Sequence, residues 1–168
     1  MLTRFEQQLK NAIDHASTSN PTSTSTSNPS TVPDPMRSRP IDVSDRVIYA
    51  ELSHAIVGAA IEVHRHIGPG QLESVYQRAL EQELGFRELP YRALVPIAML
   101  YKGCSVGEFF ADFIVDDKII VELKAVTGFA AVHKAQVLSY LRATDLRLGM
   151  LINFNVPVLW RGVHRLVR

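Results

Sequence analysis

The chain has almost no cysteine and no long apolar run. Cys104 is the one cysteine among 168 residues, which excludes an intramolecular disulfide framework and the paired cysteines of a zinc finger. We therefore expect a cytoplasmic protein in which Cys104 is a small buried hydrophobic residue. The longest apolar run, Ala55 to Val63, already contains Glu62, and a membrane span needs about 18 apolar residues. The sequence thus predicts no membrane contact.

An excess of one charge sign is also absent. The formal net charge is +1, which excludes a protein that covers DNA with a uniformly basic surface. The stretch from Arg142 to Arg168 is the exception, because it holds five arginines against one acid, Asp145. These arginines fit either a rim that faces phosphates or scattered solvated charges, and solvated charges are the commoner explanation.

Composition divides the chain into a tail and one domain. Residues 17–40 consist mostly of Ser, Thr, Asn and Pro, which bury too little apolar surface to offset the entropy of ordering. We expect residues 1–43 to form a short amphipathic segment followed by a disordered tail. With 46% hydrophobic residues overall, residues 44–168 suffice for one domain with a proper core.

Hydrophobic spacing in this domain predicts the element order α-α-β-β-β-α-β. The first helix follows a cap at Ser44 or Asp45 and ends at Gly68-Pro69-Gly70, and the second runs from Leu72 to about Gly85. The remaining elements are expected at 93–101, 106–115 and 119–124 as strands, 130–142 as a helix and 148–154 as a strand. A three-strand meander that feeds a helix and a further strand implies an α/β fold with a mixed sheet and helices on its faces.

The length of the loop around Asp116-Asp117 decides whether Asp112, Glu122 and Lys124 lie on one face of the sheet. Side chains alternate between the faces of a sheet, and directly opposed residues share a face. A two-residue loop would pair Asp112 with Val121 and send Glu122 and Lys124 to the other face. A three-residue loop, 116–118, places Asp112 opposite Glu122, with Lys124 on the same face.

With the three-residue loop, Asp112, Glu122 and Lys124 suit a metal centre. Two carboxylates about 5 Å apart at Cβ attract a hard divalent cation such as magnesium. Lys124 would then orient a water molecule or neutralise charge on a phosphate. Taken alone, however, the pattern also fits an ordinary Glu-Lys pair at an exposed strand end, and that explanation is the commoner one.

Two helices carry further candidates. Glu73 and Tyr76 lie one turn apart at the start of the second helix, where Glu73 is either a third acid near the metal or an ordinary helix N-terminal acid. In the later helix, His133, Gln136 and Tyr140 form a polar stripe, which is either part of the site or a solvated face. His64 and His66 are more often surface or capping residues than ligands.

Taken together, these motifs resemble a known family. Gly70-x-x-Glu73-x-x-Tyr76, Asp112, Glu122-x-Lys124 and Gln136-x-x-x-Tyr140 follow one another as in the GxxExxY protein family of the PD-(D/E)XK nuclease superfamily. The resemblance covers residues 44–168 and includes Ile67 to Gly70, Tyr101 to Gly103 and Leu151 to Phe154. One departure is Ala111, which stands where the superfamily has a proline before the first acid, and an arginine that some relatives carry nearby is absent.

The resemblance implies a restriction-endonuclease-like α-β-β-β-α-β core and a set of site residues. It implies Asp112 and Glu122 as ligands of Mg or Mn, Lys124 as the catalytic lysine, Glu73 as the helix acid, and Gln136 and Tyr140 as the matching catalytic element of RecB-like nucleases. We therefore expect a metal-dependent nuclease that acts on DNA or RNA. The alternative is a catalytically inactive nucleic-acid or protein-binding module that keeps the nuclease fold.

Overall fold

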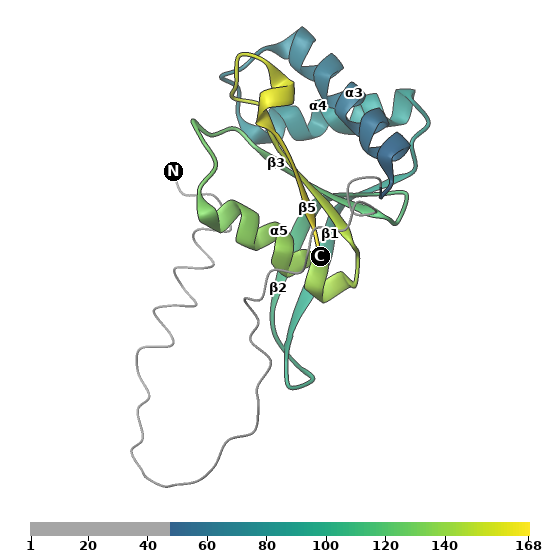
Figure 1. The fold of residues 1–168 in the computed structure, drawn as a ribbon, viewed down its shortest axis with the longest axis vertical. Helices are drawn as coiled ribbons and strands as arrows, with labels where there is room; N and C mark the ends of the chain where they lie inside the picture. The colour runs from purple at the N-terminus through teal and green to yellow at the C-terminus, as the bar shows by residue number, and fades with distance from the viewer. Residues whose placement is uncertain (1–47) are drawn as a thin grey trace, which may run out of the picture. The chain divides into compact units, whose positions relative to one another are not determined.

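The computed structural model describes residues 48–168. The predicted tail, the domain boundary at residue 43 and the helix cap at Ser44 or Asp45 lie outside the described residues. The elements are, in order, α3 (Ala50–Ile67), α4 (Glu73–Phe86), β1 (Tyr91–Tyr101), β2 (Cys104–Val115), β3 (Ile119–Lys124), α5 (Ala131–Thr144), β4 (Leu148–Asn153), the 3-10 helix η1 (Leu159–Gly162) and β5 (Val163–Val167) (Figure 1). The segment from α4 to β4 thus has the predicted order α-β-β-β-α-β.

The five strands form one mixed sheet in the order β1-β2-β3-β4-β5. The pairs β1/β2, β2/β3 and β4/β5 are antiparallel, whereas β3 and β4 are parallel and α5 makes the connection between them. A mixed sheet built from a meander and one helical crossover is the architecture that the sequence predicted, and the α/β fold class is confirmed.

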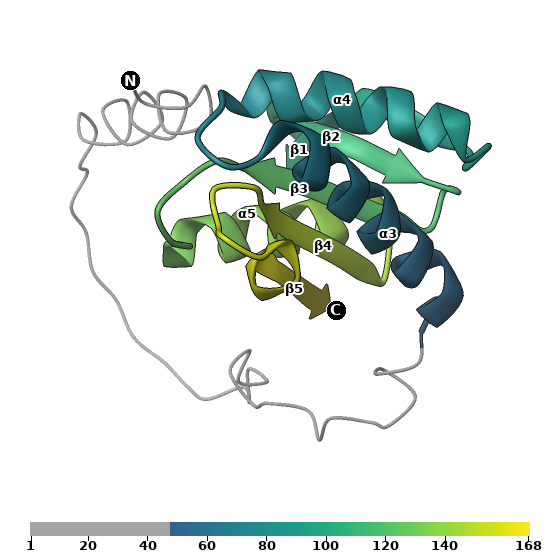
Figure 2. The same cartoon turned by 90° about the horizontal axis from the view of Figure 1, so that it is seen from above.

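Helices cover both faces of the sheet (Figure 2). The first core lies between the sheet and the α3–α4 pair, and includes Ile56, Tyr76 and Leu80 from the helices. The second core lies between the sheet and α5, and includes Val137 and Leu141 from that helix. Apolar residues alternate between the two cores along the strands, as the period of two in a strand requires.

The central strands β3 and β4 are buried along their whole length. Burial on both faces explains their near-continuous apolar composition, which is typical of a parallel pair under two layers of helices. Gly149 belongs to this arrangement, because a Cβ there would collide with the side chain of Val137 on α5. Against this background the buried charged residues of β3, Glu122 and Lys124, stand out.

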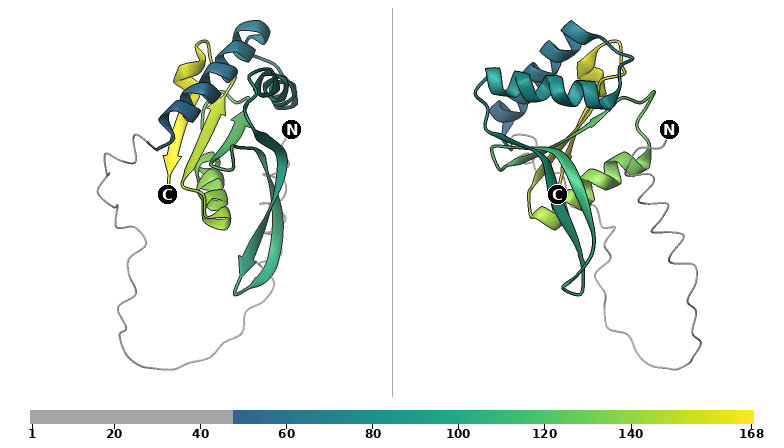
Figure 3. Two further views of the ribbon diagram at one scale, coloured as in Figure 1. Left: turned by 90° about the vertical axis from the view of Figure 1, so that its right-hand side faces the viewer. Right: turned by 180° about the vertical axis from the view of Figure 1, so that it is seen from behind.

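The β1–β2 hairpin changes faces where it passes Asp112. Ala93 and Phe113 are paired and pack in the first core, whereas Val95 and Ala111, the paired residues two positions further along each strand, pack in the second. Leu94, between them, has a left-handed φ of 51°, which interrupts the regular alternation. Beyond this point the hairpin projects away from the sheet (Figure 3).

Two expectations from the sequence need correction. The segment after Pro157, for which the sequence pattern predicts no element, contains η1 and a fifth strand. Cys104 is exposed rather than buried, because it begins β2 at the end of the projecting hairpin, beyond either core. In the described residues, no helix combines the length and apolarity that crossing a membrane requires.

Candidate metal centre

The β2–β3 hairpin has the register that the parity argument required. Val115 pairs with Ile119 and Phe113 pairs with Val121, so the loop contains three residues, 116–118. Asp116 and Asp117 adopt left-handed φ angles of 51° and 49°, and the Lys118 amide donates to the Val115 carbonyl at 3.0 Å. The prediction of a three-residue loop is confirmed.

Asp112 is held against β3 at the open end of this hairpin. The backbone amide of Leu123 donates to its Oδ2 at 2.7 Å. The carboxylate therefore lies beside the segment from Glu122 to Lys124 rather than on the far side of the sheet. The structure thus brings the two predicted metal ligands to the same part of β3.

Glu122 and Lys124 form a buried ion pair. Their residues are 3% and 4% exposed, and Lys124 Nζ donates to Glu122 Oε1 at 2.8 Å. Leu123, between them, packs in the first core, as strand alternation requires. The explanation of these residues as an exposed pair at a strand end is therefore wrong.

Glu73 approaches the same pair from α4. It is the first residue of that helix, and its Oε1 lies 3.6 Å from Lys124 Nζ. The preceding loop is shaped by Gly68 and Gly70, whose φ angles of 72° and 94° suit glycine. Glu73 is thus more than a helix N-terminal acid, because it contacts the central lysine.

Tyr76 clamps the loop that leads to Glu73. Its hydroxyl donates to the Gly68 carbonyl at 2.7 Å and accepts from the Gln71 amide at 3.0 Å. Its ring stacks on Phe154, with the centroids 4.5 Å apart and the planes at 15°. Tyr76, the last residue of the Gly70-x-x-Glu73-x-x-Tyr76 motif, thereby holds the loop before Glu73. It also fixes this loop to the segment that follows β4.

Gln136 and Tyr140 reach the cluster from α5, on the other side of the sheet. Gln136 Nε2 donates to Glu122 Oε1 at 2.7 Å and to the Tyr140 hydroxyl at 2.8 Å. Both residues are buried, at 4% and 2% exposure. The explanation of this stripe as a solvated face is wrong, and the cluster is contacted by two different helices, α4 and α5.

Asn153 is a site-supporting residue that the sequence analysis did not single out. It pairs with Lys124 in the β3–β4 register and is 2% exposed. Its Oδ1 accepts from the amides of Val126 and Asn155, each at 3.1 Å, and its Nδ2 donates to the Val126 carbonyl at 2.7 Å. Asn153 therefore joins the segments after β3 and β4. The available signal was a polar residue that ends an apolar strand.

The remaining candidates contact other parts of the molecule. His64 bonds to the Val156 carbonyl at 2.8 Å, and His66 bonds to the Glu62 carbonyl at 3.0 Å. Of the C-terminal arginines, Arg165 donates to the Ile48 carbonyl and Arg168 pairs with Asp145. These contacts assign none of the four residues to the cluster.

Burial sets the electrostatics of the cluster. Desolvation, together with the charge of Asp112, raises the pKa of Glu122 to about 8, and desolvation also raises the pKa values of Asp112 and Glu73 despite the nearby Lys124. Burial lowers the pKa of Lys124, but the three carboxylates outweigh that effect and raise it. One ammonium thus faces three acids, and a further positive charge would favour the ionised form of all three.

The donor set fits a hard divalent cation. Glu122 Oε2 and Gln136 Oε1 are buried oxygens without a hydrogen-bond partner. No group of three or more His, Cys, Asp or Glu residues within 48–168 forms a complete metal cage. Two carboxylates, Asp112 and Glu122, are available, and a hard divalent cation is often held by one or two carboxylates together with water and substrate oxygens.

Comparison with known proteins gives one match. The family described as the PD-(D/E)XK nuclease superfamily matches residues 50–166. Neither the curated proteins nor the solved structures contain a significant match. The matched range includes every element from α3 to η1 and most of β5. It also includes the six candidate site residues, Glu73, Asp112, Glu122, Lys124, Gln136 and Tyr140.

Proposed function

This chain belongs to the PD-(D/E)XK nuclease superfamily, and we propose that it hydrolyses phosphodiester bonds of nucleic acid with the help of a divalent cation, Mg²⁺ or Mn²⁺. The superfamily supports a nuclease domain with a restriction-endonuclease-like mixed α/β fold. The substrate, DNA or RNA, and the metal dependence are our proposal. The chemistry of the buried cluster supports them.

Asp112 and Glu122 would hold the cation. When bound, a divalent cation stabilises negative charge on the phosphoryl group and makes hydroxide available at neutral pH. Lys124 is the catalytic lysine in this proposal. Its ammonium, kept protonated by the three acids, neutralises charge that develops on the phosphate and orients the attacking water.

The helix residues complete the proposed site. Glu73 would accept a hydrogen bond from Lys124 or from water at the metal, since its Oε1 lies 3.6 Å from Lys124 Nζ and its side chain is 33% exposed. Gln136 orients Glu122 through its 2.7 Å hydrogen bond, and Tyr140 orients Gln136. Because burial raises the pKa of Tyr140, its hydroxyl stays protonated and acts as a hydrogen-bond partner.

One observation carries this proposal: Glu122 and Lys124 form a buried ion pair on a central strand, and Glu122 keeps one oxygen without a partner. A buried ion pair stabilises a fold little compared with apolar residues of similar volume. A cluster of three acids and one lysine is therefore better explained by chemistry than by stability.

The GxxExxY protein family is our more specific proposal within the superfamily. Its support is the motif from Gly70 to Tyr76, in which the glycine adopts a left-handed φ, the glutamate contacts Lys124 and the tyrosine closes the loop. The backbone conformation of Gly70 and the contacts of Glu73 and Tyr76 thus explain why these three residue types occur in the motif.

An inactive binding module is the competing function. It would gain nothing from buried carboxylates, which repel phosphate when no cation is bound. Incubation of the full chain with single- and double-stranded DNA and RNA, in Mg²⁺, in Mn²⁺ and in EDTA, separates the two. Cleavage that requires the cation supports the nuclease. Binding without cleavage of any substrate in either cation supports the inactive module.

A further inference from the structure

The two edges of the sheet differ in charge. Because β3 and β4 are parallel, with Lys124 paired to Asn153, the segments that follow both strands leave from the same edge. The loop before Glu73 joins them there, since His64 bonds to Val156 and Tyr76 stacks on Phe154 (Figure 1). The loops of this edge are 68–72, 125–130 and 154–162, and their only charged residue is Arg161.

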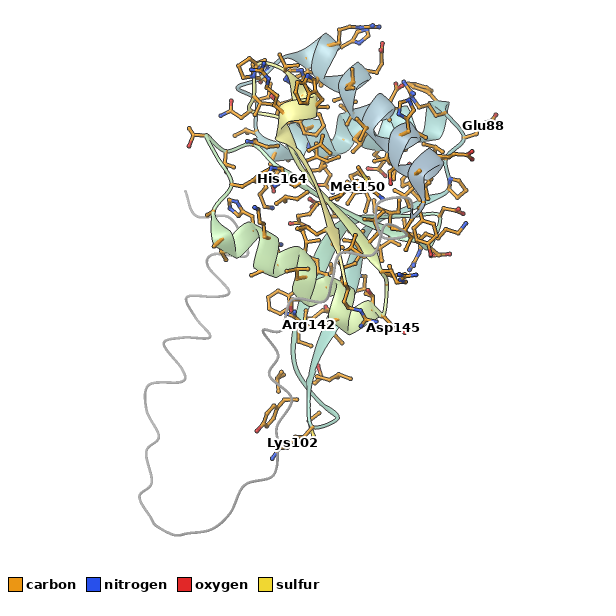
Figure 4. The ribbon with its side chains drawn as sticks, in the orientation of Figure 1. Glu88, Lys102, Arg142, Asp145, Met150 and His164 are labelled. Carbon is orange, nitrogen blue, oxygen red and sulfur yellow. The ribbon has the colours of Figure 1, made fainter. Side chains whose placement is uncertain are left out.

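The opposite edge carries acids and bases together. Its connecting segments are 87–90, 116–118 and 145–147, which contain the acids Glu88, Asp116, Asp117 and Asp145 and the bases Arg87, Lys118 and Arg147 (Figure 4 labels Glu88 and Asp145). The loops through which a polyanion approaches the buried cluster therefore contain no Asp or Glu, whereas the segments of the far edge hold four acids against three bases. We call the edge formed by loops 68–72, 125–130 and 154–162 the acid-free edge.

An exposed aromatic residue stands on the acid-free edge. Trp160, the only tryptophan of the chain, lies in η1 and is 62% exposed, and the Arg161 guanidinium lies 5.5 Å from the centre of its ring. The turn that carries it is anchored on both sides. Leu159 is buried in the first core, and Gly162 packs so closely that a Cβ would collide with the Asn153 carbonyl. Trp160 is thus presented to solvent by a firmly packed turn.

Position and chemistry together identify a ligand. The turn leads into β5, which is two strands from β3, a lateral separation of about 10 Å at the usual strand spacing. In proteins that bind single strands, exposed aromatic rings stack on bases while neighbouring cations contact the backbone. Bases of a duplex are stacked and paired, and are not free to stack on such a ring.

We propose that Trp160 stacks on an unpaired base of a single-stranded substrate, that Arg161 contacts its backbone, and that the strand continues along the acid-free edge to the cluster of Asp112, Glu122 and Lys124. This substrate preference rests on the proposed nuclease function.

The lone tryptophan permits a direct test. In the Lys124→Ala background and in Mg²⁺, a single-stranded oligonucleotide of about 12 nucleotides should quench the Trp160 fluorescence, whereas the matching duplex should not. Anisotropy of a labelled strand then gives affinities for Trp160→Ala and for Tyr101→Ala. Tyr101 is a matched control, because it is 63% exposed and has the Lys102 ammonium 5.5 Å from its ring. It is the last residue of β1, next to Lys102 at the end of the projecting hairpin (Figure 4 labels Lys102).

We expect Trp160→Ala to weaken single-strand binding roughly fivefold to a hundredfold, the range for loss of one base-stacking aromatic residue, and Tyr101→Ala to change it less than about twofold. Arg161→Ala should reduce the slope of log affinity against log salt concentration by about 0.7, as for loss of one phosphate contact in a single strand. Equal quenching by duplex and single strand, unchanged affinity of Trp160→Ala, or an equal loss in Tyr101→Ala would overturn the inference.

A cleavage assay distinguishes failure of this substrate inference from failure of the proposed nuclease function. If the otherwise unaltered chain cleaves nucleic acid and Trp160→Ala cleaves single strands with the same kcat/KM, the substrate inference is wrong and the nuclease proposal stands. If the chain binds single strands through Trp160 but cleaves nothing in Mg²⁺ or Mn²⁺, the nuclease proposal is wrong and the binding surface stands.

Discussion

At the scale of single residues, the central feature is the charge buried on β3. Placing Glu122 and Lys124 in the interior removes both from water, and their mutual attraction offsets this cost only in part. The cost is increased by Asp112, whose charge further raises the pKa of Glu122. A divalent cation would favour the ionised form of both carboxylates, so metal binding and the charge state of the site are coupled.

The two partners of the ion pair should affect metal binding in opposite ways. Glu122→Gln removes a ligand charge, and we expect Mn²⁺ affinity, measured by calorimetry, to fall at least about tenfold. Lys124→Ala leaves both carboxylates and removes a nearby cation, so affinity should be preserved or increased. Glu108→Gln, a change at an exposed acid of the hairpin, serves as the control. Equal losses in Glu122→Gln and Glu108→Gln would argue against Glu122 as a ligand.

At the scale of elements, the loop between α3 and α4 shows how a helix acid is positioned. The Tyr76 hydroxyl satisfies one amide and one carbonyl of this loop, and its ring fixes the loop to Phe154. Glu73 begins the helix immediately after the loop. The position of Glu73 relative to Lys124 should therefore depend on a hydroxyl that touches neither.

We expect Tyr76→Phe to lower the free energy of unfolding by about 1 kcal/mol, the usual contribution of a hydrogen bond, and to loosen Glu73. The readout is a double-mutant cycle with Glu73→Gln on kcat/KM. If Tyr76 acts through Glu73, the effect of Glu73→Gln should be smaller in the Tyr76→Phe background. Tyr91→Phe, on β1, is the control. Strictly additive effects would limit Tyr76 to a structural role.

The contact between α5 and β4 depends on a glycine. A Cβ at Gly149 would collide with Val137 and approach Leu141, so Gly149→Ala should lower the free energy of unfolding by about 1 to 3 kcal/mol. Gly85 in α4 has open space around it, and Gly85→Ala should instead stabilise the protein by up to about 1 kcal/mol. Chemical denaturation measures both changes. Changes of the same sign in the two variants would contradict this packing. Val137→Ala should restore part of the free energy of unfolding that Gly149→Ala loses.

Elements differed in how far they could be predicted from the sequence. The β2–β3 register followed from the alternation of side chains, because only a three-residue loop puts Asp112 and Glu122 together. The strand β5 was missed, since four half-buried residues and one exposed residue after a proline carry a weak pattern. The face change at Leu94 was also missed, because a left-handed leucine has no signature in the sequence.

At the scale of the whole domain, the site is assembled by long-range packing. Glu73, Asp112, Glu122 and Gln136 come from two helices and two strands, and no local pattern shows that they meet. Their joint motif indicated the nuclease superfamily, but the contacts of Asn153 required the β3–β4 pairing. The edge on which Trp160 stands became apparent only from the strand order.

The single-turnover rate of nucleic-acid cleavage in Mg²⁺ by Lys124→Ala, beside the unaltered chain, tests the central claim most directly. We expect the unaltered chain to cleave and Lys124→Ala to cleave at least about a hundredfold more slowly, as for other electrostatic or acid-base groups. Cleavage by Lys124→Ala at the unaltered rate would contradict the account of the cluster as the catalytic centre.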